Sequence, residues 1–147
     1  MRPKISIIIA TYNSEATLER ALKSVVSQEF DAKELLVVDG ASTDGTLDII
    51  GQYQKNMHWW ITEKDTGVYD AWNKALQHAN GEWVYFLGSD DYLWDSQVLT
   101  QAAWALDASG ARTRIAYGQV AFTTKKSAVI GMAGEPWCAS TALLIKW

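Results

Sequence analysis

Two adjacent aspartates follow directly on an apolar run and are the residues best suited to chemistry in this sequence. Residues 83–87 are all apolar, and Gly88 and Ser89 separate them from Asp90 and Asp91. An unbroken apolar run of this length is typical of a strand covered on both faces, as in a parallel sheet packed between helices. Two carboxylates at the end of such a strand are hard oxygen ligands that can hold a divalent cation. Alternatively, they only begin a turn and cap the next helix, because Asp is common at both places.

Two earlier apolar runs end in polar residues in the same way. The polar residues that follow the runs at 5–10 and 34–38 are Thr11, Tyr12, Asn13, Asp39, Ser42 and Asp44. The carboxyl ends of parallel strands lie along one edge of a sheet, so these side chains are expected to meet Asp90 and Asp91 in one crevice. The loop that holds Asp65, Tyr69 and Asp70 enters the same edge. Acids gathered in this way repel one another unless cations or hydrogen-bond donors intervene, which favours a ligand that carries a metal.

Apolar periodicity predicts alternating strands and helices over roughly the first 110 residues. Strands are expected at 5–10, 34–38, 58–62 and 83–87. Helices are expected with apolar stripes over 18–26, 46–53, 70–79 and 96–107. The predicted helix caps are Asn13 or Ser14, Thr43 or Asp44, and Asp95 or Ser96. Further strands are expected at 114–120, 121–123 and 141–145, with a hairpin partner at 127–132. The alternation implies an α/β fold with parallel strands and right-handed crossovers, followed by a short β-rich segment.

The composition is that of one globular domain. The chain has 147 residues, of which 48% are hydrophobic and 20% charged, which argues against a disordered or fibrous class. Residues up to Asp107 hold 16 acids and 8 bases, which argues against a nucleic-acid-binding surface. The remaining residues hold one acid and five bases. The lone Cys138 fits a reducing compartment, and the absence of a signal sequence or a membrane-length apolar run predicts a cytoplasmic location.

A nicotinamide-dependent oxidoreductase is a less favoured alternative. An acid at the end of the second strand, here Asp39, is what a dinucleotide-binding fold uses to hold a ribose hydroxyl. The first turn, residues 10–15, contains no glycine that would let the backbone approach a pyrophosphate. The chain also contains no phosphate-binding loop ending in GKS or GKT. A bound diphosphate would therefore need another device, which a divalent cation at Asp90 and Asp91 would supply.

Four segments together resemble a known family. The segments SIIIATYN (6–13), VDGASTDGT (38–46), DTGVYDAWNK (65–74) and FLGSDD (86–91) are similar to the successive motifs of family 2 glycosyltransferases with the GT-A fold. The resemblance implies a mostly parallel, Rossmann-like three-layer sheet. It assigns residues 1–107 to nucleotide-sugar binding and 108–147 to a short, incomplete acceptor side of a single domain.

The resemblance also implies an activity. Members transfer a sugar with inversion from a nucleotide-diphosphate donor, a UDP-sugar being favoured here, with the help of Mn²⁺ or Mg²⁺. The acceptor would be a glycan or a lipid-linked acceptor in polysaccharide biosynthesis, and the protein would act in the cytoplasm or at the inner face of the membrane. A truncated, non-catalytic module that only binds nucleotide sugars is the alternative function.

Roles carry over to this chain by matching positions. Thr11, Tyr12 and Asn13 would line the base and ribose pocket, and Asp39 would hydrogen-bond the base. The remaining donor-site residues in the matched segments are Ser42, Asp44, Asp65, Gly67, Asp70, Asn73 and Lys74. Asp90 would contact ribose or metal and Asp91 the metal. Many members have a further Asp where this chain has Gly88, which leaves the metal fewer protein ligands.

The base that would activate the acceptor is expected in the C-terminal part of the chain. Glu135 is the only acid after Asp107 and is therefore the candidate, although no recognisable motif surrounds it. Trp137 and Trp147 would form an acceptor platform in one interpretation and are ordinary packing residues in the other.

Overall fold

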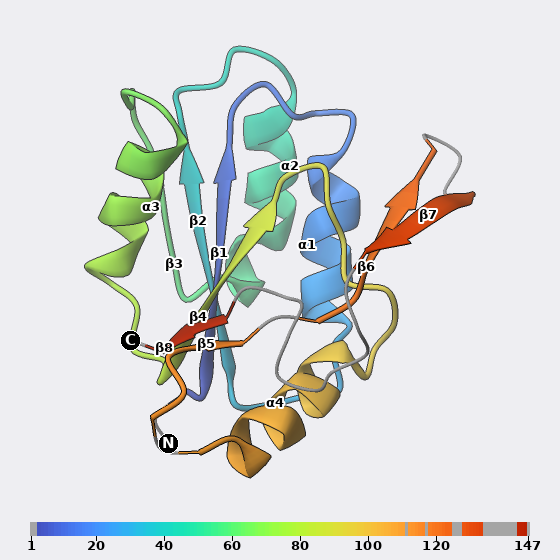
Figure 1. Cartoon of the computed structure of the whole chain (residues 1–147). Helices are drawn as coiled ribbons and strands as arrows, with labels where there is room; N and C mark the ends of the chain where they lie inside the picture. The colour runs from blue at the N-terminus through green and yellow to red at the C-terminus, as the bar shows by residue number, and fades with distance from the viewer. Residues whose placement is uncertain (1–2, 111, 117, 125–127, 134–143, 147) are drawn as a thin grey trace.

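The computed structural model describes residues 3–110, 112–116, 118–124, 128–133 and 144–146 (Figure 1). The strands are β1 (Ile5–Thr11), β2 (Lys33–Asp39), β3 (Trp59–Thr62), β4 (Trp83–Gly88), β5 (Ile115–Ala116), β6 (Val120–Thr123), β7 (Val129–Ala133) and β8 (Leu144–Lys146). The helices are α1 (Leu18–Val26), α2 (Thr46–Tyr53), α3 (Val68–Leu76) and α4 (Val98–Ala108), with a 3₁₀ turn, η1, at Gln54–Asn56. The predicted alternation of strand and helix over the first 110 residues is confirmed.

The main sheet is mostly parallel and has the order β3-β2-β1-β4-β8-β5. Strands β1 to β4 run parallel to one another, whereas β8 pairs antiparallel with both β4 and β5. Parallel neighbours require crossover connections, and α1, α2 and α3 provide them. The expected fold class, an α/β sheet of mostly parallel strands flanked by helices, is therefore confirmed.

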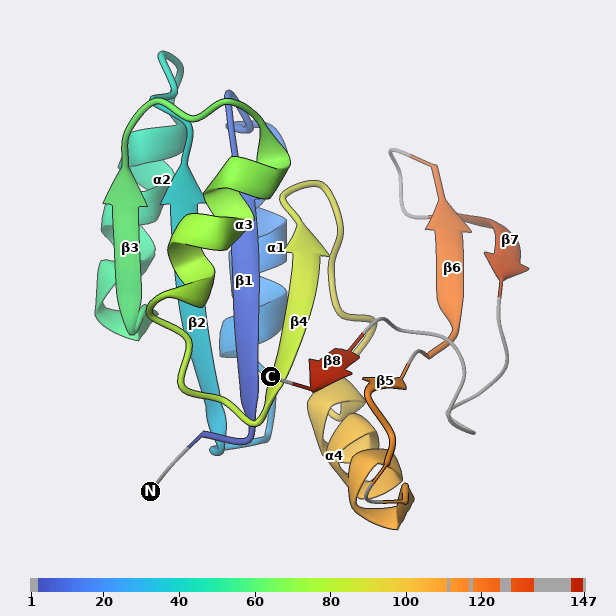
Figure 2. The same ribbon diagram turned by 60° about the vertical axis from the view of Figure 1, so that its left-hand side comes forward.

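The two faces of the sheet bury alternate residues of the same strands. From β1, Ile5, Ile7 and Ile9 pack with α1, α2 and α4, whereas Ile8 packs with α3. Figure 2 shows α3 on one face and α1 and α2 on the other. Because both faces are covered, the central strands are continuous apolar runs rather than alternating ones. This explains the composition of residues 5–10 and 83–87.

The helices begin at other residues than the predicted caps. The observed N-caps are Thr17, Gly45, Gly67 and Gln97, and none of them makes a side-chain capping hydrogen bond. Asn13 was wrong as a cap because its Oδ1 accepts the Thr43 N–H (2.9 Å), which ties it to another loop. Asp44 accepts the Thr46 N–H (3.0 Å) from one position before the cap.

The C-terminal strands differ from the prediction in their grouping. Strands β6 and β7 form the expected hairpin and lie to one side of the main sheet in both views (Figures 1 and 2). A single strand over 114–120 was wrong, because β5 ends at Ala116 and pairs with β8 in the main sheet. Pairing with a segment about thirty residues further along the chain is a tertiary event that local β-propensity does not report.

Candidate functional site

The carboxyl ends of β1, β2 and β4 lie side by side at one edge of the sheet. In the strand register Thr11 is opposite Asp39, and Ala10 is opposite Gly88. The three polar strand ends predicted from the sequence therefore meet as expected (Figure 1). The loop after β4 brings Asp90 and Asp91 to this edge, which is where open α/β sheets bind ligands. We call it the carboxyl edge.

The loops after β1 and β2 are joined by hydrogen bonds at this edge. The Asn13 N–H donates to Ser42 Oγ (2.8 Å), and the Ser14 N–H donates to Thr46 Oγ1 (2.8 Å). Asn13 adopts a left-handed φ of 48°, which Asn tolerates better than most residues. The Glu15 N–H donates to Asp44 Oδ2 (3.1 Å). Hydrogen bonds of Asn13, Ser42 and Asp44 thus hold the loops after β1 and β2 together at the carboxyl edge.

Asp39 has no exposed surface, and its carboxylate is hydrogen-bonded by the protein itself. Its oxygens accept the Ser42 N–H (3.0 Å), the Ser42 hydroxyl and the Thr62 hydroxyl (2.6 Å). A buried carboxylate satisfied in this way anchors the loop that follows it. The predicted hydrogen bond from Asp39 to a base stays a prediction. Thr62 was not among the sequence candidates, because its role depends on the pairing of β2 with β3.

Tyr12 and Asp65 pack against Gly40 just after β2. A Cβ atom at Gly40 would lie 2.8 Å from Asp65 Oδ2 and 3.4 Å from Tyr12 Cδ2, so glycine permits this close approach. The Tyr12 side chain is 62% exposed and presents an aromatic ring at the edge. The Thr11 hydroxyl is buried and, among the described residues, lacks a hydrogen-bond partner. Such unpaired buried groups are rare in folded proteins.

Asp90 and Asp91 fold back over Gly88. A Cβ atom at Gly88 would lie 2.8 Å from Asp91 Oδ2 and 3.0 Å from Asp90 Oδ1, so both carboxylates face the same small volume. Burial, and then the charge of Asp90, raise the pKa of Asp91; Arg20 and the Gly88 hydrogen bond oppose this rise. Two crowded carboxylates that repel each other are a donor set suited to a hard divalent cation.

A metal at this point would need further ligands. In the described part of the chain, no group of three or more His, Cys, Asp or Glu side chains is arranged to hold a metal ion. Mg²⁺ commonly binds through one or two carboxylates together with phosphate oxygens and waters. The two aspartates therefore fit a metal that arrives with, or is completed by, a phosphate ligand.

The loop that carries Asp90 and Asp91, which we call the acid loop, is supported by Arg20 and Tyr92, two residues that sequence reasoning missed. Arg20 Nη2 donates to the Asp90 carbonyl oxygen (3.1 Å), and its guanidinium lies 4.3 Å from the centre of the Tyr92 ring. The hydroxyls of Ser14 and Ser89 are 3.0 Å apart and link the loop after β1 to the end of β4. These contacts join residues about seventy or more positions apart, so no local sequence pattern indicates them.

Most of the donor-site residues predicted in the loop before α3 and in α3 itself make hydrogen bonds or ion pairs with one another or with nearby residues of the same segment. Asp65 Oδ1 accepts the Gly67 N–H (2.9 Å), and Asp70 Oδ2 accepts the Thr66 N–H (3.0 Å). Lys74 Nζ donates to the Lys64 carbonyl oxygen (3.0 Å) and lies 2.9 Å from Glu63 Oε1 and 3.6 Å from Asp70 Oδ2. The hydrogen bond from Thr66, and then the charge of Lys74, lower the pKa of Asp70. Asn73 is exposed on α3.

Glu135, Trp137, Cys138 and Trp147 lie outside the described residues. The structure therefore neither supports nor opposes Glu135 as the base. None of the helices in the described ranges is long and apolar enough to span a membrane.

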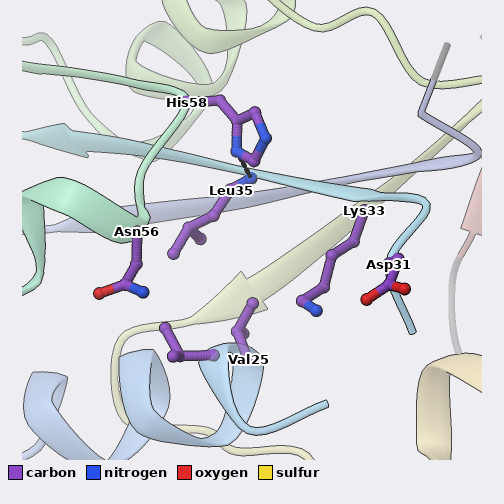
Figure 3. A pocket seen from close by; sticks show the side chains of 7 residues that line it. Val25, Asp31, Lys33, Leu35, Asn56 and His58 are labelled. Carbon is purple, nitrogen blue, oxygen red and sulfur yellow. Dashed lines mark hydrogen bonds between the residues drawn. The ribbon is translucent and has the colours of Figure 1, made fainter. Parts of the chain in front are cut away.

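A cavity of about 230 Å³ lies at the opposite, amino edge of the sheet, between α1 and the start of β2 (Figure 3). Lys33 and His58 line it, but both make hydrogen bonds to the main chain. Lys33 Nζ donates to the carbonyl oxygens of Phe30 (2.7 Å) and Gln28 (3.0 Å), and His58 Nδ1 accepts the Leu35 N–H (3.2 Å). The carboxyl edge, where carboxylates converge, is therefore the better candidate site despite being open.

The fold and the carboxyl edge define an α/β protein whose candidate ligand site lies at the ends of parallel strands, and comparison with known proteins gives the family. The model of glycosyl transferase family 2 matches residues 6–131. The chain therefore belongs to glycosyl transferase family 2.

Relatives and solved structures agree with this assignment. A PGL/p-HBAD biosynthesis glycosyltransferase of Mycobacterium bovis is 43% identical over 104 residues, covering 69% of this chain and 41% of the relative. TarS 1–349 of S. aureus, solved with UDP-GlcNAc, is 36% identical with a TM-score of 0.66, and the match covers 71% of this chain and 31% of that 1–349 chain. The mannosyltransferase PcManGT of Pyrobaculum calidifontis, solved with GDP-Man and Mn²⁺, is 28% identical with a TM-score of 0.69. The match covers 83% of this chain and 36% of the PcManGT chain. This chain spans about two fifths of the length of such curated relatives.

Proposed function

We propose that this chain is the donor-binding part of a metal-dependent, inverting glycosyltransferase that uses a nucleotide-diphosphate sugar, with a UDP-sugar favoured. The acceptor would be a glycan or a lipid-linked glycan. The observation that carries the proposal is the meeting of Asp90 and Asp91 with the polar ends of β1 and β2 at the carboxyl edge. Membership of glycosyl transferase family 2 and the nucleotide sugars bound by TarS and PcManGT support it.

The nucleoside would lie over the ends of β1 and β2. Tyr12 offers an exposed ring for stacking. Asp39 would act mainly by holding the loop around Ser42 in place, through the hydrogen bonds described above. Asp65, packed on Gly40 beside Tyr12, would border the same pocket.

The diphosphate would lie beside the acid loop. Asp90 and Asp91 would hold Mn²⁺ or Mg²⁺, which offsets the negative charge that develops on the leaving nucleoside diphosphate. Arg20 would keep the loop in place through the Asp90 carbonyl. Transfer also needs a carboxylate that removes the acceptor proton as the acceptor hydroxyl attacks the anomeric carbon, and Glu135 remains the proposed base.

A thermal-shift screen tests this function. The chain would be heated with UDP, GDP, UDP-glucose, UDP-GlcNAc and GDP-mannose, each with and without Mn²⁺. We expect a rise in melting temperature that requires both a nucleotide sugar and the metal, because a ligand that binds only the folded state stabilises it. A tight response to NADH in place of these ligands would refute the proposal.

Isothermal titration then tests the residue assignment. Asp91→Ala should lose the metal-dependent part of nucleotide-sugar binding, whereas Asp48→Asn, which removes an exposed acid on α2, should bind as the unaltered chain does. If Asp91→Ala binds the nucleotide sugar and Mn²⁺ as tightly as the unaltered chain, Asp91 is not a metal ligand. Measuring donor hydrolysis and transfer in parallel separates a catalytic chain from one that only binds the donor.

A further inference from the structure

Three aromatic side chains form a connected series from β4 to the solvent. Phe86 on β4 packs against Trp72 on α3 with ring centres 4.3 Å apart, and Trp72 meets Tyr69 edge to face at 5.4 Å. Phe86 and Trp72 are half-buried against the core that α3 covers. Tyr69, at the outer end, is 75% exposed. Most of its ring is therefore available to a ligand even though the ring is already supported from behind.

The segment that carries Tyr69 is held firmly by its own polar groups. Gly67 adopts a φ of +125°, a conformation that L side chains rarely adopt, and its N–H is bound by Asp65. Asp70 binds the Thr66 N–H, and Lys74 joins α3 to the preceding loop through Glu63. The start of α3 is thereby fastened in one geometry. A fixed ring loses little conformational entropy when a ligand binds to it.

The aromatic series stands next to the acid loop. Phe86 precedes Gly88 by two residues on β4, and Asp90 and Asp91 fold over Gly88. Two residues along a strand span about 7 Å. Both ribbon views show α3 beginning at the carboxyl edge (Figures 1 and 2). Tyr69, near the start of α3, therefore borders the same edge of the sheet as the two aspartates, and the group bonded to a phosphate held there could extend to it.

We propose that Tyr69 is a stacking platform for the sugar ring of the nucleotide-sugar donor. This inference rests on the proposed function and adds a residue that selects the sugar rather than the nucleotide. A pyranose ring presents an apolar face of C–H groups, and the electron-rich face of a tyrosine ring is a suitable partner for it. Trp72 and Phe86 fill the packing role behind Tyr69, so the exposed ring is free to contact ligand. The sugar gains a fixed orientation beside the metal-binding acids.

The test compares binding of nucleotides with binding of nucleotide sugars. Isothermal titration in Mn²⁺ would measure UDP, UDP-glucose, UDP-GlcNAc, GDP and GDP-mannose on the unaltered chain and on Tyr69→Ala, Tyr69→Phe and Val68→Ala. Val68 is the exposed, non-aromatic neighbour of Tyr69 and serves as the matched control. Circular dichroism melting curves would confirm that each variant is folded.

The expected result is a loss confined to the sugar. Tyr69→Ala should bind the preferred nucleotide sugar about three- to tenfold more weakly while its affinity for the bare nucleotide is unchanged. Tyr69→Phe and Val68→Ala should behave as the unaltered chain does. Equal affinities of Tyr69→Ala and the unaltered chain for the nucleotide sugar would overturn the inference, as would an equal loss for nucleotide and nucleotide sugar. Failure of the unaltered chain to bind any nucleotide would instead overturn the proposed function, and the inference with it.

Discussion

The guanidinium of Arg20 on α1 donates a hydrogen bond to the main-chain carbonyl of Asp90, 70 positions further along the chain, at 3.1 Å. The same guanidinium lies over the Tyr92 ring at 4.3 Å, so one side chain holds the loop on both sides of Asp91. Its charge also lowers the pKa of Asp91, against the larger effect of burial. Arg20 is therefore expected to act as a positioning residue for the acid loop.

Replacement of Arg20 should weaken the metal site specifically. In Arg20→Met we expect affinity for Mn²⁺ in the presence of UDP to fall about tenfold, because residues that orient metal ligands commonly have effects of this size. Arg20→Lys should recover only part of the loss, since an ammonium group has no planar face to stack on Tyr92. Titration calorimetry would measure this, with Lys23→Met on the exposed face of the same helix as control. Full metal affinity in Arg20→Met would contradict the positioning role.

Asp91 should destabilise the metal-free fold at neutral pH. Its pKa is raised in the folded state, so between the ordinary carboxyl value and the raised value the folded chain binds more protons than the unfolded chain. Stability from this group is therefore present at low pH and is lost as the pH rises through that window. We expect Asp91→Asn to melt at a higher temperature than the unaltered chain at pH 7 in EDTA, and the difference to vanish near pH 3. Asp48→Asn controls for loss of one negative charge, and a lower melting temperature in Asp91→Asn would refute the prediction.

Substitution of Asp39 should lower the free energy of unfolding, whatever its effect on nucleotide binding. Asp39→Asn replaces one of the two carboxylate oxygens with an NH2 group that cannot accept a hydrogen bond, so a donor of Ser42 or Thr62 loses its acceptor, and an unsatisfied buried group costs about 1–3 kcal/mol. Urea denaturation would measure this loss. Thr62→Val removes one of the three donors and should cost less, about 1 kcal/mol. Nucleotide affinity of Asp39 variants is informative only under conditions where they are folded.

Substitution of Gly81 by alanine should destabilise the fold, because no space is left for a Cβ atom. A Cβ atom there would lie 2.5 Å from Ser6 Oγ, 2.6 Å from the Ser6 main-chain nitrogen and 2.9 Å from the Trp83 carbonyl oxygen. Main-chain atoms of two adjacent strands cannot move aside cheaply, so Gly81→Ala should lower the free energy of unfolding by about 1–3 kcal/mol. Gly51→Ala, inside α2 with open space around it, should instead raise it by about 0.5–1 kcal/mol. Equal effects at both positions, measured by urea unfolding, would show that close approach is not the cause.

The role of Gly81 shows what a local pattern can miss. The helix predicted over 70–79 is too long at its C-terminus, because α3 ends at Leu76 with Gln77 as its C-cap, before Gly81. Gly81 is required instead by the approach of two strands, and its N–H donates to Ser6 Oγ (2.9 Å) and Glu34 Oε1 (3.0 Å). The sequence indicates the type of residue, but the contact that requires it is formed by residues up to 75 positions away.

The sequence by itself determined the order of the elements and the edge where the polar residues meet. Apolar period is a local property, so the buried runs before Thr11, Asp39 and Asp90 predict parallel strands whose ends lie together. Only the tertiary structure decided what each polar side chain does there. Asp39 anchors a loop, Asp65 and Asp70 fasten the start of α3, and Arg20 supports the acid loop. The physical reason is that alternative hydrogen-bond partners of one polar group differ by only about 1 kcal/mol, so the choice depends on which distant segments the packed core brings within reach.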